Sequence, residues 1–131
     1  MTIHLDRLDG RFAVVRLEAD HGWPHWATGS RAFVSVTRTV HETSVICDER
    51  LVPPGVRAER DFVAYAVRGP LEFSAVGVLA RLTAPLAAAG IPLLAISTFD
   101  TDILLLRTAS ADDARRAWHA SGIATADVAG E

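Results

Sequence analysis

Residues 66–107 decide the fold: AVRGPLEFSAVGVLARLTAPLAAAGIPLLAISTFDTDILLLR. They contain an apolar run, a Gly-Pro turn, a segment with apolar residues at helical spacing, and two more apolar runs joined by the polar segment STFDTD. This pattern predicts a strand, a helix over residues 75–89, and strands over residues 93–98 and 103–107. A helix in this position buries its apolar face on the sheet that the strands form.

A second helix and a last strand complete the C-terminal half. Ser110, followed three residues later by Asp113, is close to a capping box, and a helical apolar pattern continues to Gly122. A final strand is expected over residues 123–128. With a strand over residues 62–68, the order is β-α-β-β-α-β, a ferredoxin-like arrangement in which right-handed crossovers put both helices on one face.

The N-terminal half is a reduced version of this design. Three strands and a short helical turn are expected, over residues 11–18, 32–38, 43–47 and 21–26. Residues 32–46 can be laid over residues 93–105, because both segments join two apolar strands through a short turn rich in Thr and acids. A weak internal repeat therefore indicates two similar lobes.

Composition and charge exclude several classes of protein. Half of the 131 residues are hydrophobic, the net charge is −3, and all thirteen basic residues are Arg, without the clustered basic surface that nucleic acid requires. No apolar stretch reaches the roughly 20 residues of a membrane span, and no signal-peptide pattern opens the chain. The single Cys47 excludes an intramolecular disulfide. We therefore expect a cytoplasmic protein that binds neither nucleic acid nor membrane.

The sequence lacks a constellation for catalysis or metal binding. His21 and His25 have helical spacing but straddle a Gly and a Pro, and Cys47 lies next to two acids with no nearby cation that would lower its pKa. His41 with Glu42 is the only adjacent pair suited to acid–base chemistry. We expect no enzyme activity, no metal and no cofactor.

A small-molecule site is expected where the first helix begins. A strand that enters a helix through Gly69-Pro70 leaves backbone N–H groups unpaired at the helix N-terminus, and these favour a carboxylate. Asp100 and Asp102 supply negative charge for an ammonium or guanidinium group. A free amino acid carries both charges. In the alternative interpretation, the two Asp side chains merely cap a β-turn.

Residues 69–106 and 32–56 resemble the small tandem ACT-domain proteins, which are bacterial relatives of the ACT modules of aspartate kinases and of the eukaryotic cytosolic arginine sensors. The resemblance implies an α+β fold of two ferredoxin-like (βαββαβ) ACT lobes, with antiparallel sheets and helices on one face. Residues 1–60 would form a reduced, degenerate lobe and residues 61–131 a complete one. It also implies a non-catalytic amino-acid-binding module that pairs with a second copy, with the ligand at the interface between lobes or subunits.

The resemblance also implies ligand-binding residues, in the turn that enters the first helix, at the start of the following strand and in the polar segment. These are Glu72, Ala75, Val76, Gly77, Val78, Pro92, Leu93, Thr98, Phe99 and Asp102. The N–H groups of residues 76–78 would bind the α-carboxylate, and Asp102 the cation. Plainer roles are a helix N-cap for Ser74, relief of helix–sheet crowding at Gly77, and core packing for Phe99 and Leu93.

The predicted function is that of a regulatory or sensor protein that binds a small amino acid or zwitterion. It is expected to form a homodimer and to be recognised by an unidentified regulated protein. Glu72 and Ala75 depart from the entry turn of the arginine sensors, so arginine is not assumed as the ligand. The same departures favour the alternative, a structural dimer or adaptor that has lost ligand binding.

Overall fold

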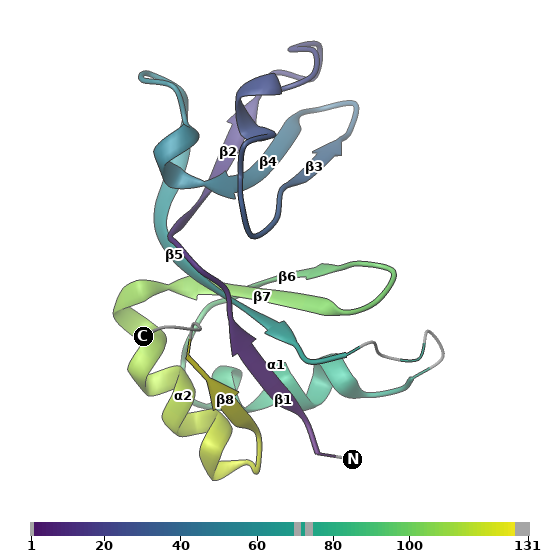
Figure 1. Ribbon diagram of the computed structural model, residues 1–131, viewed down its shortest axis with the longest axis vertical. Coiled ribbons are helices and arrows are strands. Elements are labelled where there is room, and N and C mark those ends of the chain that lie inside the picture. The colour runs from purple at the N-terminus through teal and green to yellow at the C-terminus, as the bar shows by residue number, and fades with distance from the viewer. Residues whose placement is uncertain (1, 70–71, 73–74, 128–131) are drawn as a thin grey trace. The chain divides into compact units, whose positions relative to one another are not determined.

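The computed structural model describes residues 2–69, 72 and 75–127 (Figure 1). Pro70, Ser74 and Val128, to which the sequence assigned a turn, an N-cap and a strand end, lie outside these residues. The elements are β1 (His4–Arg7), β2 (Phe12–Leu17), η1 (His25–Ala27), β3 (Ser35–Arg38), β4 (Thr43–Asp48), η2 (Glu49–Leu51), β5 (Ala58–Val67), α1 (Val78–Ala88), β6 (Leu94–Ser97), β7 (Asp102–Arg107), η3 (Thr108–Ser110), α2 (Ala111–Ala120) and β8 (Ala124–Ala126).

The chain divides into two units, an N-terminal unit of residues 9–62 and a C-terminal unit of residues 1–8 and 63–131. Strand β5 belongs to both, because residues 58–62 lie in the first unit and residues 63–67 in the second. Residues 1–8 were expected in the N-terminal lobe, whereas β1 pairs with strands of the C-terminal unit.

The C-terminal unit has the predicted α+β fold, with the order β5-α1-β6-β7-α2-β8. Its strands lie in the order β6-β7-β5-β1-β8. The additional strand β1 lies between β5 and β8, antiparallel to the former and parallel to the latter, with Leu5 opposite Val67 and Thr125. The sheet is therefore mostly, but not entirely, antiparallel. Leu5 of β1 and Ile3, just before the strand, are buried in the same core as the helices, which explains why this strand is held there.

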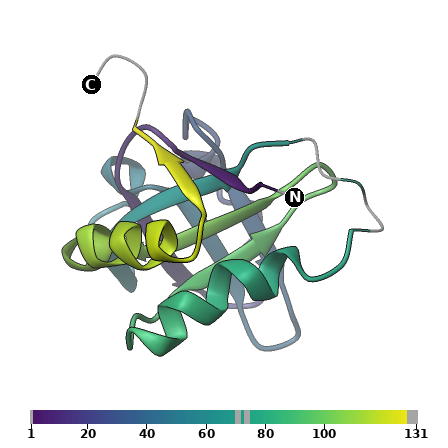
Figure 2. The ribbon, with the colours of Figure 1, turned by 90° about the horizontal axis from the view of Figure 1, so that it is seen from below.

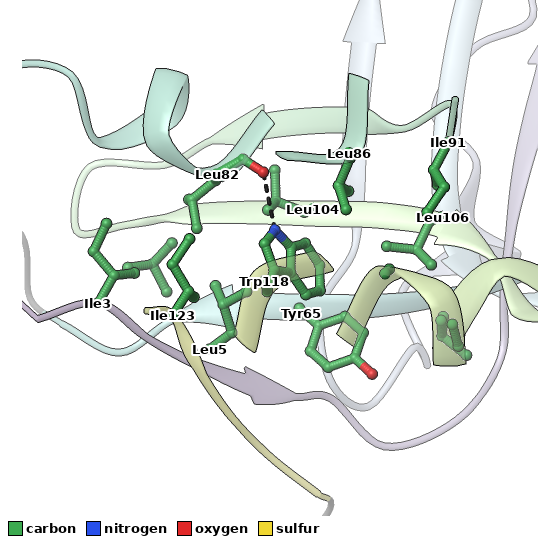
Figure 3. Packing of buried hydrophobic residues seen from close by; sticks show 14 of the residues in the cluster. Ile3, Leu5, Tyr65, Leu82, Leu86, Ile91, Leu104, Leu106, Trp118 and Ile123 are labelled. Carbon is green, nitrogen blue, oxygen red and sulfur yellow. Dashed lines mark hydrogen bonds between the residues drawn. The ribbon is translucent and has the colours of Figure 1, made fainter. Parts of the chain in front are cut away.

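Both helices cover the same face of this sheet, as predicted (Figure 2). Leu82 and Leu86 of α1 and Trp118 of α2 are fully buried in one apolar core with residues of β1, β5 and β7. The indole Nε1 of Trp118 donates a hydrogen bond of 2.9 Å to the carbonyl of Leu82 (Figure 3). The ring of Tyr65 meets that of Trp118 edge-on, with 5.2 Å between centroids. The indole thus links the two helices directly.

The two α-helices end in the same way. In α1, the N–H of Ile91 bonds to the carbonyl of Leu86, and the N–H of Gly90 bonds to that of Ala87. The same pair of bonds closes α2 around Gly122. This is the Schellman motif, which needs a left-handed residue after the helix, and Gly90 and Gly122 have φ of 74° and 79°. The predicted stop signals are confirmed.

Gly122→Ala should lower the free energy of unfolding by about 1 kcal/mol, because an L side chain resists the left-handed conformation. A Cβ at this position would meet no atom within 4 Å, so backbone strain is the whole effect. Chemical denaturation measures the difference. Gly29→Ala is the matched control: its φ is not positive and its Cβ would make ordinary contact with Leu51, so its stability should not fall. Equal losses in both variants would contradict this explanation.

The predicted capping box at the start of α2 does not form. Ser110 is the N-cap residue, but its side chain makes no capping hydrogen bond. It is also the last residue of the 3-10 turn η3, and its φ and ψ of −97° and −1° are helical rather than extended. An N-cap side chain reaches the helix N–H groups from an extended backbone, which this turn prevents.

The N-terminal unit is a four-stranded antiparallel arrangement in the order β3-β4-β2-β5. No long helix was expected in this unit, and its described part contains the short 3-10 turns η1 and η2 but no α-helix. Its small core contains Val15, Val45 and Cys47, and Trp26 packs against it. Trp23, by contrast, is 54% exposed.

The internal repeat is visible in the structure. The first and last residue numbers of β6, β7 and η3 exceed those of β3, β4 and η2 by 59. For example, β3 begins at Ser35 and β6 begins at Leu94. The two hairpin turns also share their hydrogen bonds. The N–H groups of Thr39 and Thr98 bond to the carbonyls of Glu42 and Thr101, and the Thr hydroxyl oxygens accept the return N–H bonds. The predicted alignment is thus corrected by two residues at its start, where it paired residue 32 with residue 93, whereas its end, residue 46 with residue 105, agrees with the structure.

Candidate functional site

A pocket of about 310 Å³ lies in the C-terminal unit between the start of α1 and the β6–β7 turn. Seven of the ten predicted binding residues line it: Glu72, Ala75, Gly77, Val78, Thr98, Phe99 and Asp102. Leu79, Ser97, Asp100 and Thr101 complete the lining. The predicted residues Val76, Pro92 and Leu93 are not part of it. Val76 is 92% exposed, and Leu93 packs against the core, as its plainer interpretation held.

The helix side of the pocket includes the N-terminus of α1. Gly77 is the N-cap residue of α1, with φ of 80°, and no side chain caps the helix. The first turn of α1 contains no acid either. The N–H groups at a helix N-terminus lack intrahelical partners and carry partial positive charge. Because Gly77, Val78 and Leu79 line the pocket, this positive end faces the cavity.

The hairpin side is held by threonines rather than by the two Asp residues. The Thr98 N–H donates to the carbonyl of Thr101 at 2.8 Å, and the Thr101 N–H donates to Oγ1 of Thr98 at 3.1 Å. The hydroxyl of Thr101 also donates to the carbonyl of Val67 at 2.6 Å, which ties the turn to β5. The interpretation that Asp100 and Asp102 merely cap this turn is therefore wrong.

Asp102 instead interacts with its cross-strand neighbour. Ser97 and Asp102 are paired in the β6–β7 register, and the Ser97 hydroxyl donates to Oδ1 of Asp102 at 2.6 Å. This bond orients the carboxylate at the wall of the pocket. Phe99, at the tip of the turn, is 81% exposed, so the core role considered for it is also wrong.

The pocket combines acidic side chains with a helix N-terminus. Its charged side chains are the acids Glu72, Asp100 and Asp102, and the lining contains neither Arg nor His. Asp100 and Asp102 lie on the hairpin side and Glu72 precedes α1 on the helix side, where the helix N-terminus supplies positive partial charge. A ligand with an ammonium or guanidinium group at one end and a carboxylate at the other matches this arrangement.

Leu79 and Thr101 were not predicted as pocket residues. Leu79 belongs to the first turn of α1 only because the helix begins at Val78, three residues later than expected. Thr101 faces the pocket because its turn is tied to β5. The periodic pattern of the sequence gave no signal for either contact.

The remaining chemical candidates have structural explanations. Cys47 is fully buried, and desolvation, reinforced by the charge of Asp48, raises the pKa of its thiol to about 11. The thiol therefore stays protonated at neutral pH and behaves as a small apolar group. Within residues 2–69, 72 and 75–127, no group of three or more His, Cys, Asp or Glu side chains is arranged to hold a metal. Neither α-helix in that part has the length and apolar character needed to cross a bilayer.

The C-terminal unit has the features of a class of small α+β domains, namely a split βαβ core and a pocket at a helix N-terminus. A family model described as the ACT domain matches residues 57–120, and a second model, described as an N-terminal domain, matches residues 10–55. The chain therefore contains an ACT domain. No curated protein matches it in sequence.

Solved structures show the same fold. Protein Atu0741 from Agobacterium tumefaciens is 31% identical, with a TM-score of 0.91 over 98% of this chain and 95% of that one. The regulatory subunit of aspartate kinase from Thermus thermophilus is 12% identical, with a TM-score of 0.61 over 92% and 97%. Aspartate kinase from Clostridium acetobutylicum is 11% identical, with a TM-score of 0.65 over 92% of this chain but 34% of that one. At these lower identities the likeness concerns the fold.

Proposed function

We propose that this protein is a non-catalytic ACT regulatory or sensor protein that binds an amino acid or a similar small zwitterion. The main support is the pocket itself, in which Asp100 and Asp102 of the hairpin and the uncapped N-terminus of α1 line one cavity. The fold shared with the regulatory subunit of an aspartate kinase supports a regulatory role. Seven of the residues that the family resemblance implied lie together in this pocket, although they are distant in sequence.

A second copy of the chain would complete the assembly. Strand β6 is rich in apolar residues, but in the single chain its Leu94 is 40% exposed. In the described structure β6 pairs with β7 alone, so its other edge offers free backbone groups. A homodimer that covers this edge would explain the apolar composition of β6. A regulated partner protein would recognise the ligand-bound state of the dimer.

Ligand binding should be measurable as stabilisation. A ligand that binds the folded state alone adds about 2.7 kcal/mol at a hundredfold excess over Kd. We would screen the twenty amino acids at millimolar concentration by thermal shift. A selective rise in Tm that grows with concentration would support the proposal, whereas a flat screen of a stable dimer would favour the adaptor.

Asp102→Asn should weaken the binding of the responding amino acid by about tenfold to a hundredfold, because a charge-assisted hydrogen bond contributes about 1.5–3 kcal/mol. The substitution keeps the size of the side chain and the acceptor for Ser97. Isothermal titration calorimetry measures Kd. Asp113→Asn is the matched control, since Asp113 lies on α2 and pairs with Arg116. Unchanged affinity in Asp102→Asn would show that the ligand binds elsewhere.

A further inference from the structure

Two buried polar groups of the C-terminal unit lack a hydrogen-bond acceptor. Tyr65 is 1% exposed, and its hydroxyl oxygen lies at the end of the ring that points away from Trp118 (Figure 3). This hydroxyl and Nε of Arg7 are the buried side-chain nitrogen and oxygen atoms without a regular hydrogen bond in the described part of the chain. Buried polar groups in native proteins almost always have a partner in the protein or in a bound molecule. The two atoms therefore indicate a missing acceptor.

The two groups are neighbours on the helix-covered face of the sheet. Arg7 of β1 lies opposite Tyr65 of β5 in the antiparallel register, so their side chains project from the same face. This face also carries the buried residues Leu5 and Val67. Among the described residues, no carboxylate forms an ion pair with Arg7.

Further charged groups approach the Tyr65 hydroxyl. Burial raises the pKa of Tyr65, whereas the positive charges of Arg115 on α2 and of Arg7 oppose that rise, as does the approach of an Arg115 N–H to the hydroxyl oxygen. The hydroxyl is thus protonated at neutral pH and can donate a hydrogen bond. Arg115 also pairs with Asp112, which leaves N–H groups of its guanidinium for another acceptor. Asp127, just after β8, is the acid that adds to the rise of the Tyr65 pKa, and its side chain is exposed to solvent.

We propose that Arg7, Tyr65 and Arg115 form a binding site for a small oxyanion, such as a phosphate, a sulfate or a carboxylate group. These three side chains supply donors from two strands and a helix, and guanidinium groups match the paired oxygens of such anions. The site shares no residue with the pocket at the β6–β7 turn, so the inference is independent of the proposed function.

The single tyrosine of the chain permits a direct test. Tyrosine labelled with ¹³C at Cζ gives one NMR signal, which reports the environment of this hydroxyl. We would titrate the full chain with sodium phosphate, holding ionic strength constant with sodium chloride, and repeat the titration with sulfate and acetate. A saturable shift of the signal is expected, and the relative affinities distinguish tetrahedral anions from carboxylates.

Variants separate a built site from nonspecific attraction. Arg7→Gln should weaken the response at least tenfold, and Arg115→Gln should weaken it as well. Arg116→Gln is the matched control, because Arg116 is its neighbour on α2 but has a 71% exposed side chain, and its response should stay within twofold. Circular dichroism confirms that each variant is folded.

Two results would overturn the proposal. One is a signal that stays unchanged at constant ionic strength for all three anions, which would mean that the hydroxyl is satisfied by water. The other is an equal response in Arg7→Gln, which would indicate an adventitious ion only.

Discussion

Trp118→Ala should lower the free energy of unfolding by about 4 kcal/mol. Trp118 is fully buried, packs edge-on against Tyr65, and donates a hydrogen bond to the carbonyl of Leu82. The substitution therefore creates a large cavity between α1, α2 and the sheet and removes the direct link between the helices. Urea denaturation followed by far-UV circular dichroism measures the loss as a lower midpoint.

Two further variants separate packing from hydrogen bonding. Trp118→Phe keeps an aromatic ring but cannot donate to Leu82, so it should lose roughly half as much stability. Trp23→Ala removes the same side chain from a 54% exposed position and should cost less than about 1 kcal/mol. If Trp118→Ala and Trp23→Ala were equally stable, the indole would not be the centre of this core.

The elements that the sequence predicts well are those that local patterns specify. The helix α1 follows from the spacing of Leu82 and Leu86, and both α-helices end where Gly90 and Gly122 allow a left-handed residue. The hairpin β6–β7 follows from two apolar runs around a polar turn. In each case the deciding interactions join residues close in the chain, so the sequence pattern contains them.

Strand β1 shows where this approach fails. Its four residues include the charged side chains of Asp6 and Arg7. This pattern is too short to predict a strand without knowledge of its partner strands. Those partners are Tyr65–Val67 and β8, which are distant in the chain. Arg68 pairs with Asp6 through two hydrogen bonds, and this guanidinium holds the pKa of Asp6 below its usual value. Such long-range pairing has no local signature.

The same distinction applies to the candidate site. The family resemblance placed Glu72, Thr98 and Asp102 in one pocket, and the structure brings them together. It also placed Pro92 and Leu93 there, although the Schellman turn after α1 leads directly into β6 away from the pocket lining. Which residues of a segment face a pocket depends on the start of the helix and on the anchoring of the turn by Thr101, and neither is encoded locally.

Asp48→Ala should lower the free energy of unfolding by about 2–3 kcal/mol, a large effect for a polar residue of the N-terminal unit. Asp48 is 6% exposed, and its Oδ2 accepts hydrogen bonds from the backbone N–H of Arg31 at 3.1 Å and from Arg50 at 3.3 Å. Its own N–H donates to Ser30 Oγ at 2.8 Å. The carboxylate thus ties the loop before β3 to the end of β4. Its removal leaves the N–H of Arg31, now in a part-buried hydrogen bond, without this acceptor, and chemical denaturation measures the cost.

The conservative variant identifies the cause of that loss. Asp48→Asn keeps an oxygen acceptor for the Arg31 N–H but removes the charge, so it should retain more than half of the lost stability. Asp20→Ala, which removes an exposed carboxylate of the same unit, should change stability by less than about 0.5 kcal/mol. The core of this unit is small and consists of a few residues around Cys47. The hydrogen bonds of Asp48 should therefore contribute as much to the free energy of unfolding as a single apolar side chain of that core. An Asp48→Ala variant as stable as Asp20→Ala would show instead that apolar packing alone holds the loop.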